Sequence, residues 1–145
     1  MINLSKYTKH GKFKLHSGQY SDIFYDVKEM ICNDELSEIL NYVETNLDLH
    51  MFNTIVGIES AGAIIASQVY MMMMHDIRLA IVTKDNKLIG KVVEPYLLID
   101  DTSTTENSIR KAIEIIGKEP AKIYVVVDRR EQNKSSLKID SMFRV

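Results

Sequence analysis

The sequence predicts an α/β protein in which helices flank an open, mostly parallel sheet. Short apolar runs of strand length alternate along the chain with longer segments whose apolar residues recur at helical spacing. Several of the short runs are apolar at nearly every position, as expected for strands that are covered on both faces. An alternation of strands and helices is typical of parallel sheets with helices on both sides.

The composition fits one soluble domain. The chain has 145 residues, of which 46% are hydrophobic and 26% are charged. Its net charge of −2 lacks the basic excess of most nucleic-acid-binding proteins. The longest apolar region, 61–74, is too short to span a membrane, and the single Cys32 indicates a reducing compartment. We therefore expect one cytoplasmic domain over 1–145, with neither nucleic acid nor membrane as a partner.

The elements follow one another in a regular order. Residues 34–48 have apolar side chains at spacings of three, four, seven and eleven, which predicts an amphipathic helix with Asn33 as its N-cap. A helix at 107–117 is expected to stop at Gly117 and Pro120. Residues 87–93 fit either a hairpin or a mobile arm. The other predicted elements are an extended segment at 13–27 with Gly18 in a turn, a buried helix at 61–74, and strands at 54–58, 78–82, 96–100, 122–128 and 141–145.

Polar side chains follow each of four predicted core strands. Right-handed crossovers bring the carboxyl ends of parallel strands to one edge of a sheet, where ligands bind in open α/β folds. We therefore expect these side chains to form one site. The polar pairs, in chain order, are Glu59-Ser60, Thr83-Lys84, Asp100-Asp101 and Asp128-Arg129.

The third of these strand ends has the most informative chemistry. The carboxylates of Asp100 and Asp101 can bind a divalent metal, accept hydrogen bonds from sugar hydroxyls, pair with basic side chains, or simply follow the strand in a turn. Hydroxyl side chains beside the amides of a helix start suit an oxyanion. Carboxylates that can bind a diol, next to hydroxyls that can bind a phosphate, would suit a ribose 5-phosphate. The hydroxyl residues are Ser103, Thr104, Thr105 and Ser108.

This segment, LLIDDTSTTENS, resembles the signature of the type I phosphoribosyltransferases, with Asp100, Asp101, Thr105 and Ser108 at matching positions. Other segments are similar to the orotate phosphoribosyltransferase branch. The resemblance implies that family's Rossmann-like fold, with 1–30 as a base-binding hood and 51–145 as the core. The similar segments are FKLHSGQYSDIFYD (13–26), VGIESAGAIIA (56–66), VVVDRRE (125–131) and the closing LKIDSMFRV (137–145).

The resemblance also implies roles for the matched residues. Lys84, which precedes the family's catalytic loop, would be catalytic together with Asp100 and Asp101. The donor, phosphoribosyl pyrophosphate, would be bound by Ser60, Ala61, Gly62, Asp100, Asp101, Ser103, Thr104, Thr105, Glu106, Asn107 and Ser108. The base would be bound by His16, Phe24, Tyr25, Thr104 and Arg129.

The implied enzyme is a glycosyltransferase of pyrimidine biosynthesis. It would join a pyrimidine base, orotate first among them, to phosphoribosyl pyrophosphate and release pyrophosphate. No covalent nucleophile is needed, because positioning and electrostatics carry such a reaction. The resemblance further implies Mg²⁺ carried by the donor without direct protein ligands, and a homodimer that shares its catalytic loop between subunits.

Three features depart from the family pattern. Glu106 and Asn107 replace a small, usually Gly-containing pair, and an anionic side chain there is expected to weaken or replace 5-phosphate binding. Ser103 to Glu106 also fit a capping box, in which the Glu side chain folds back on the helix start. The arm after the second core strand, TKDNKLIGKVVEP (83–95), is short and also fits a simple hairpin with solvated lysines. His16 stands where the family has a lysine.

These departures leave alternatives open. The first function is the enzyme described above. The alternative is a degenerate, non-catalytic homologue that binds a nucleotide or a protein partner. A further possibility is an enzyme of the same fold that acts on another base.

Overall fold

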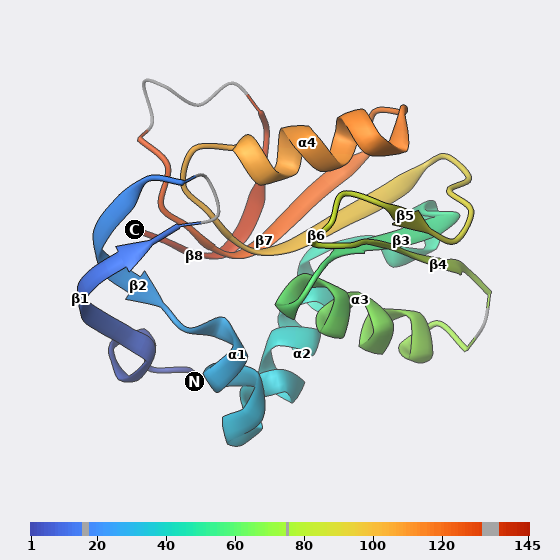
Figure 1. The fold of residues 1–145 in the computed structure, drawn as a ribbon. Coiled ribbons are helices and arrows are strands. Elements are labelled where there is room, and N and C mark those ends of the chain that lie inside the picture. The colour runs from blue at the N-terminus through green and yellow to red at the C-terminus, as the bar shows by residue number, and fades with distance from the viewer. Residues whose placement is uncertain (16–17, 75, 132–136) are drawn as a thin grey trace.

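The computed structural model describes residues 1–15, 18–74, 76–131 and 137–145 of the chain. Its centre is a six-stranded sheet in the order β5-β4-β3-β6-β7-β8 (Figure 1). Neighbouring strands are parallel except for β4 and β5, so the prediction of a mostly parallel sheet is confirmed. The strands are β3 (Thr54–Ile58), β4 (Arg78–Val82), β5 (Leu88–Ile89), β6 (Tyr96–Ser103), β7 (Lys122–Asp128) and β8 (Asp140–Arg144).

Helices cover both faces of this sheet. In Figure 1, α4 lies on one face, whereas α2 and α3 lie on the other. The two faces alternate along β6: Leu97 and Ile99 belong to the core under α2 and α3, whereas Leu98 packs with Ile109 of α4. This double burial explains why the core strands are apolar at nearly every position. The helices are α1 (Val27–Met30), α2 (Leu36–Asn46), α3 (Ala61–Met72) and α4 (Asn107–Ile116), with short helical turns at Leu4–Tyr7, Ile31–Glu35 and Leu49–Met51.

The helix ends agree with the sequence only in part. The α4 helix ends as expected, because Gly117 adopts a left-handed conformation and its N–H donates to the Ile113 carbonyl at 2.9 Å. The prediction of Asn33 as the N-cap of α2 is wrong. Asn33 and Asp34 form a kink, with Asp34 at a φ of 65°, and the helix begins at Leu36. Asn and Asp tolerate such conformations, so the pair marks a break and not a start.

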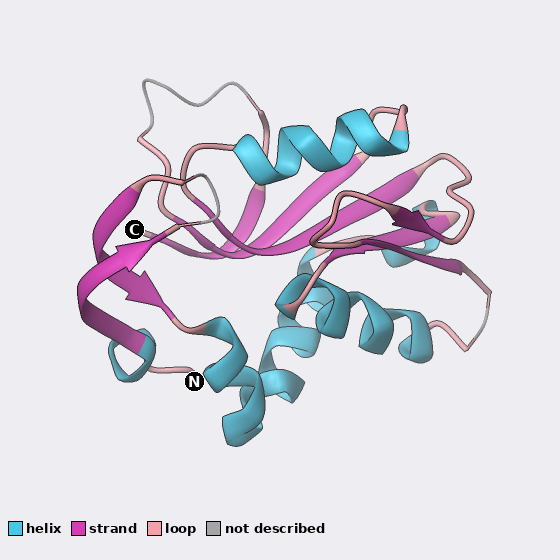
Figure 2. Cartoon of the chain, in the orientation of Figure 1, coloured by secondary structure: helices cyan, strands magenta, loops and turns pink. Residues whose placement is uncertain are grey.

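The N-terminal region forms its own two-stranded antiparallel sheet, which lies beside the main sheet (Figure 2). Its strands are β1 (Thr8–Lys14) and β2 (Tyr20–Tyr25). The predicted turn at Gly18 is confirmed, with a φ of 85°. Pairing begins at Thr8, earlier than the predicted extended segment. The sequence does not predict this earlier start, because TKHGKFK is polar and shows no clear hydrophobic period.

The arm after β4 is a hairpin. The Thr83 N–H donates to the Lys87 carbonyl at 2.8 Å, Asn86 takes a φ of 63°, and β5 returns antiparallel to β4. Of the two alternatives for this segment, the structure has the hairpin. In the part of the chain that is described, no helix is both long and apolar enough to cross a membrane.

Candidate active site

The carboxyl ends of four core strands meet at one edge of the sheet. From β3 the chain crosses to β4 on one side, while β6 lies on the other side, so the strand order switches direction between β3 and β6. A cleft opens at this point. Among the described residues, its lining includes all the predicted site residues except Ala61, Gly62 and Ser103; His16 lies outside the described residues.

The first wall of the cleft is formed by the end of β3 and the start of α3. Glu59 and Ser60 line the cleft, and the peptide bond between them is cis. A Cβ atom at Gly62 would lie 2.5 Å from the carbonyl oxygen of Ile99, so glycine allows α3 to pack directly against β6. Ala61 and Gly62 therefore lie behind the wall. Any contact they make with a ligand would come from the backbone of the first helical turn.

The two aspartates at the end of β6 have different environments. Asp100 is buried, and its carboxylate accepts hydrogen bonds from the Ser108 hydroxyl at 3.1 Å and from the Asp101 N–H at 2.8 Å. Burial, with the neighbouring Asp101 charge as a second cause, raises the pKa of Asp100 well above its ordinary value. Asp101 is only partly buried and accepts from the Thr102 N–H at 2.7 Å. Asp101 is thus the more accessible carboxylate.

The hydroxyl-rich loop joins β6 to α4. Thr104, Thr105 and Ser108 line the cleft, whereas Ser103 belongs to β6 and is buried. The capping-box prediction is wrong: α4 begins at Asn107, and Glu106 occupies the N-cap position without a side-chain capping bond. Glu106 has a φ of 67°. It therefore adopts the left-handed backbone that a glycine at this position would adopt easily.

The Glu106 side chain turns toward a buried arginine. Its Oε2 accepts from Arg130 Nη1 at 3.3 Å and from the Leu137 N–H at 3.1 Å. Arg130 in turn donates to both carboxylate oxygens of Asp128 at 2.9 Å, and Arg144 donates to Asp128 at 2.7 Å. Burial acts to raise the pKa of Asp128, but the bonds and charges of these arginines outweigh it and hold that pKa below its ordinary value.

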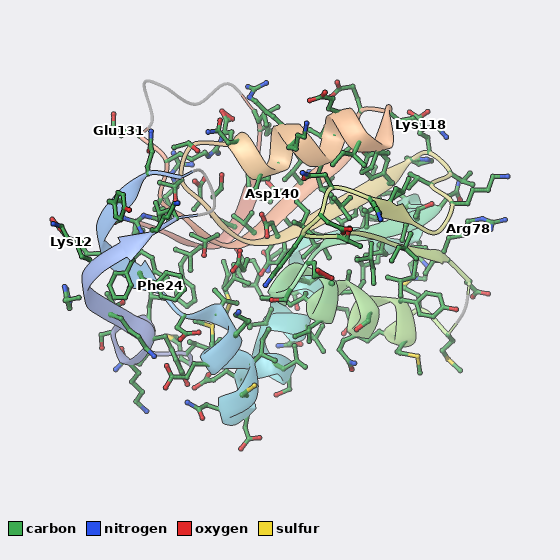
Figure 3. All side chains as sticks on the ribbon, viewed as in Figure 1. Lys12, Phe24, Arg78, Lys118, Glu131 and Asp140 are labelled. Atoms are coloured by element: carbon green, nitrogen blue, oxygen red, sulfur yellow. The ribbon has the colours of Figure 1, made fainter. Side chains whose placement is uncertain are left out.

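The opposite wall of the cleft comes from the N-terminal hairpin. Phe24 and Tyr25 both line the cleft, and in Figure 3 Phe24 lies on the inner side of the hairpin. Arg129 donates to the Ile23 carbonyl at 2.8 Å and to the Ser21 hydroxyl at 2.9 Å. Its guanidinium also lies 5.3 Å from the Tyr25 ring centroid. Arg129 thus ties β2 to the end of β7 while it faces the cleft.

Three lysine residues, in addition to Arg129, line the same cleft. Lys84 follows β4, and its N–H donates to Glu59 at 3.1 Å, which connects the ends of β4 and β3. Lys14 and Lys28, from β1 and α1, also line the cleft, although the sequence analysis did not select them. Lys14 lies inside the segment 13–26 on which the resemblance rests, which was the available signal. Lys28 lies two residues beyond that segment.

The fold is that of the type I phosphoribosyltransferases. The structure superimposes on orotate phosphoribosyltransferase from Aeropyrum pernix with a TM-score of 0.79 and 22% identity, covering 97% of this chain and 91% of that one. It also matches UMP synthase from Leishmania donovani with a TM-score of 0.77 and 24% identity, over 97% of this chain and 34% of that one.

Proteins with similar sequences show which family within this fold the chain belongs to. The chain is 31% identical to orotate phosphoribosyltransferase from Pyrococcus furiosus, over 94% of its own length and 82% of the relative's. The corresponding protein of Methanococcus maripaludis is 30% identical, over 89% of this chain and 77% of that one. No protein-family model matches the chain. At this identity and coverage, the chain belongs to the orotate phosphoribosyltransferase family.

Proposed function

We propose that this chain is an orotate phosphoribosyltransferase, which joins orotate to phosphoribosyl pyrophosphate and releases pyrophosphate. The observation that supports this most is that one cleft combines two kinds of wall. On one wall lie Asp100, Asp101 and the hydroxyl loop, which suit a ribose 5-phosphate. On the other lie Phe24 and Tyr25 with Arg129, which suit a flat, acidic ring.

The proposed mechanism relies on positioning. Asp101 would accept hydrogen bonds from the ribose hydroxyls, with Asp100 behind it fixed by Ser108. The hydroxyls of Thr104 and Thr105, with the first amides of α4, would hold the 5-phosphate. As the bond from the sugar to pyrophosphate loosens, positive charge builds on the sugar, and the held base nitrogen attacks it. Fixed charges and dipoles that match this transition state would supply the acceleration.

The charge of the cleft suits two anionic substrates. Lys84 lies beside the start of α3, where the pyrophosphate of the donor would lie against the helix N-terminus. Arg129 offers a cation to the carboxylate of orotate, and Lys14 and Lys28 add positive charge on the same wall. Uracil has no such carboxylate and would leave the charge of Arg129 without an anionic partner.

Mg²⁺, dimerisation and location complete the proposal. Within residues 1–15, 18–74, 76–131 and 137–145, no three acidic, histidine or cysteine side chains come together as a metal-binding group. We propose that Mg²⁺ would be held chiefly by the donor's pyrophosphate, whose departure it would assist by neutralising charge. We further propose a cytoplasmic homodimer in pyrimidine biosynthesis, with 1–30 as the hood over the base and 51–145 as the core.

One observation favours binding without turnover as a second candidate. The arm after β4 is a tight hairpin in which Lys87 pairs with Asp85 at 3.4 Å, so this segment brings Lys84 alone into the described lining of the cleft. A short arm would cover less of the pyrophosphate. In that case the chain would bind a nucleotide or a protein partner.

A product search by mass spectrometry separates these candidates. The purified chain would be incubated with Mg²⁺, phosphoribosyl pyrophosphate and a mixture of orotate, uracil and purine bases. The proposal predicts the nucleotide of orotate as the main product. A different nucleotide would assign the enzyme to another base. No product, from folded protein that still binds the donor, would favour the binding-only candidate.

A further inference from the structure

Glu106 places an anionic side chain in the loop that we propose for the 5-phosphate. It occupies the N-cap of α4, between cleft-lining Thr105 and Asn107. A carboxylate beside a phosphate would repel it, and the sequence alone leads to the expectation that Glu106 weakens phosphate binding. The position of Arg130 leads to a different conclusion.

Arg130 is a buried counter-charge for Glu106. The two side chains are 4% and 5% exposed, and their charged atoms are 3.3 Å apart. Arg110 also approaches Glu106, at 3.7 Å, but its side chain is 51% exposed, so solvent screens its charge. Arg130 is itself held by both oxygens of Asp128, which fixes its guanidinium in place.

The same contacts orient the loop. Glu106 Oε2 accepts from both Arg130 and the Leu137 N–H, so its carboxylate is bonded on the side of β7 and of the segment before β8. Arg130 also donates to the Leu137 carbonyl at 2.8 Å. The left-handed backbone at Glu106 is thereby stabilised by its side chain, at a position where most residues are strained.

We propose that Arg130 is a positioning residue that neutralises Glu106 and so keeps the loop receptive to the 5-phosphate. This inference rests on the proposed function, because it assumes that the loop binds a phosphate. Arg130 does not line the cleft that contains Asp100 and Asp101, but it lines a neighbouring pocket with Thr104, Thr105 and Glu106. We assign its effect to its contact with Glu106. Glu106, with Arg130 as its buried counter-charge, then stands in place of the glycine of the family pattern.

The test is a cycle of variants whose affinity for phosphoribosyl pyrophosphate with Mg²⁺ is measured by calorimetry. Glu106→Gln is expected to change the affinity by less than about threefold, because the charge that it removes is already paired. Arg130→Met is expected to lower the affinity by about tenfold or more, because it removes the buried counter-charge of Glu106, whose negative charge then repels the phosphate. The double variant is expected to recover most of this loss, because no unpaired Glu106 remains.

Two comparisons keep this test independent of folding. Arg130→Met and the double variant both lose the hydrogen bonds from Arg130 to Asp128, so any difference in affinity between them is due to Glu106. Arg144→Met is the matched control: Arg144 also donates to Asp128, from β8, so the affinity is expected to stay within about threefold. If Arg130→Met fails to fold, Glu106→Gln still tests the inference, because a gain in affinity of about tenfold would overturn it.

The outcomes separate this inference from the proposed function. A gain of tenfold or more in Glu106→Gln would overturn the inference, since it would mean that the Glu106 charge acts on the phosphate unneutralised. An equal loss in Arg130→Met and in the double variant would also overturn it. No binding of the donor by the unchanged chain would instead contradict the proposed function.

Discussion

The Ser108 hydroxyl donates a hydrogen bond of 3.1 Å to the buried carboxylate of Asp100. Ser108 lies in the first turn of α4, and Asp100 lies near the carboxyl end of β6. This bond joins the proposed phosphate loop to the proposed ribose site. The two parts of the donor would therefore be held at a fixed separation by the protein itself.

Removal of this bond tests its role. In Ser108→Ala, Asp100 loses a hydrogen bond inside the protein, at an expected cost of about 1 to 2 kcal/mol. We expect kcat/KM for phosphoribosyl pyrophosphate to fall by about tenfold or more, since both the carboxylate and the loop lose an anchor. Ser67→Ala is the matched control, because the Ser67 hydroxyl bonds to Ile64 within α3. Equal kinetics in the two variants would contradict the role assigned to Ser108.

Asp100→Asn is expected to stabilise the protein and to reduce its activity. The folded-state pKa of Asp100 is raised, so this carboxyl supports folding fully below its unfolded pKa of about 4, and loses that contribution as the pH rises through the folded value. Asparagine carries no such charge. Denaturation from pH 4 to pH 8 should show an advantage for the variant that grows with pH. A variant that is less stable than the unchanged chain at pH 8 would contradict the expectation that the buried Asp100 carboxylate destabilises the fold.

Asp128→Asn should have the opposite effect on stability. The folded-state pKa of Asp128 is lowered, so its contribution is present above the unfolded pKa of about 4 and is lost as the pH falls through the folded value. At pH 7 the variant leaves Arg130 without its anionic partner at Asp128, at an expected cost of about 3 kcal/mol. The same denaturation series should show the difference from the unchanged chain shrinking below about pH 4. A difference that does not depend on pH would contradict this assignment.

Arg129→Met should loosen the N-terminal hairpin from the core. Two hydrogen bonds to β2 and the stacking on Tyr25 would be lost, so amides in 20–25 should exchange with solvent faster. The affinity for orotate should fall by about tenfold, whereas the affinity for the donor should change little. Arg78→Met is the control, because Arg78 lies at the amino end of β4, whereas the cleft lies at the carboxyl ends of the strands. Unchanged exchange in 20–25 would argue against Arg129 as the link between hairpin and core.

The core of the fold could be predicted from the sequence because its signals are local. Apolar runs such as 54–58 and 122–128 mark buried strands, and the polar residues after them converge because the strands are parallel. The resemblance in the segment 96–109 then indicated the class of ligand. All of these depend on residues that are close together in the sequence.

The parts that could not be predicted depend on distant contacts. The Ser103–Glu106 pattern fits a capping box, but Glu106 is held by Arg130 and by the backbone at Leu137, which no local pattern shows. Lys28 likewise reaches the cleft only because the hairpin and α1 are placed beside it. Local propensity was overridden at these positions by tertiary contacts, as is common at functional sites.

The most direct test of the proposed activity is orotate-dependent release of pyrophosphate from phosphoribosyl pyrophosphate and Mg²⁺. The unchanged chain would be compared with Asp101→Asn, which alters the accessible carboxylate of the proposed ribose site but adds no bulk. We predict that release requires orotate and that the variant is slower by about 100-fold. Equal rates in the two proteins, or no orotate-dependent release from folded protein, would contradict the account of this cleft as an orotate phosphoribosyltransferase site.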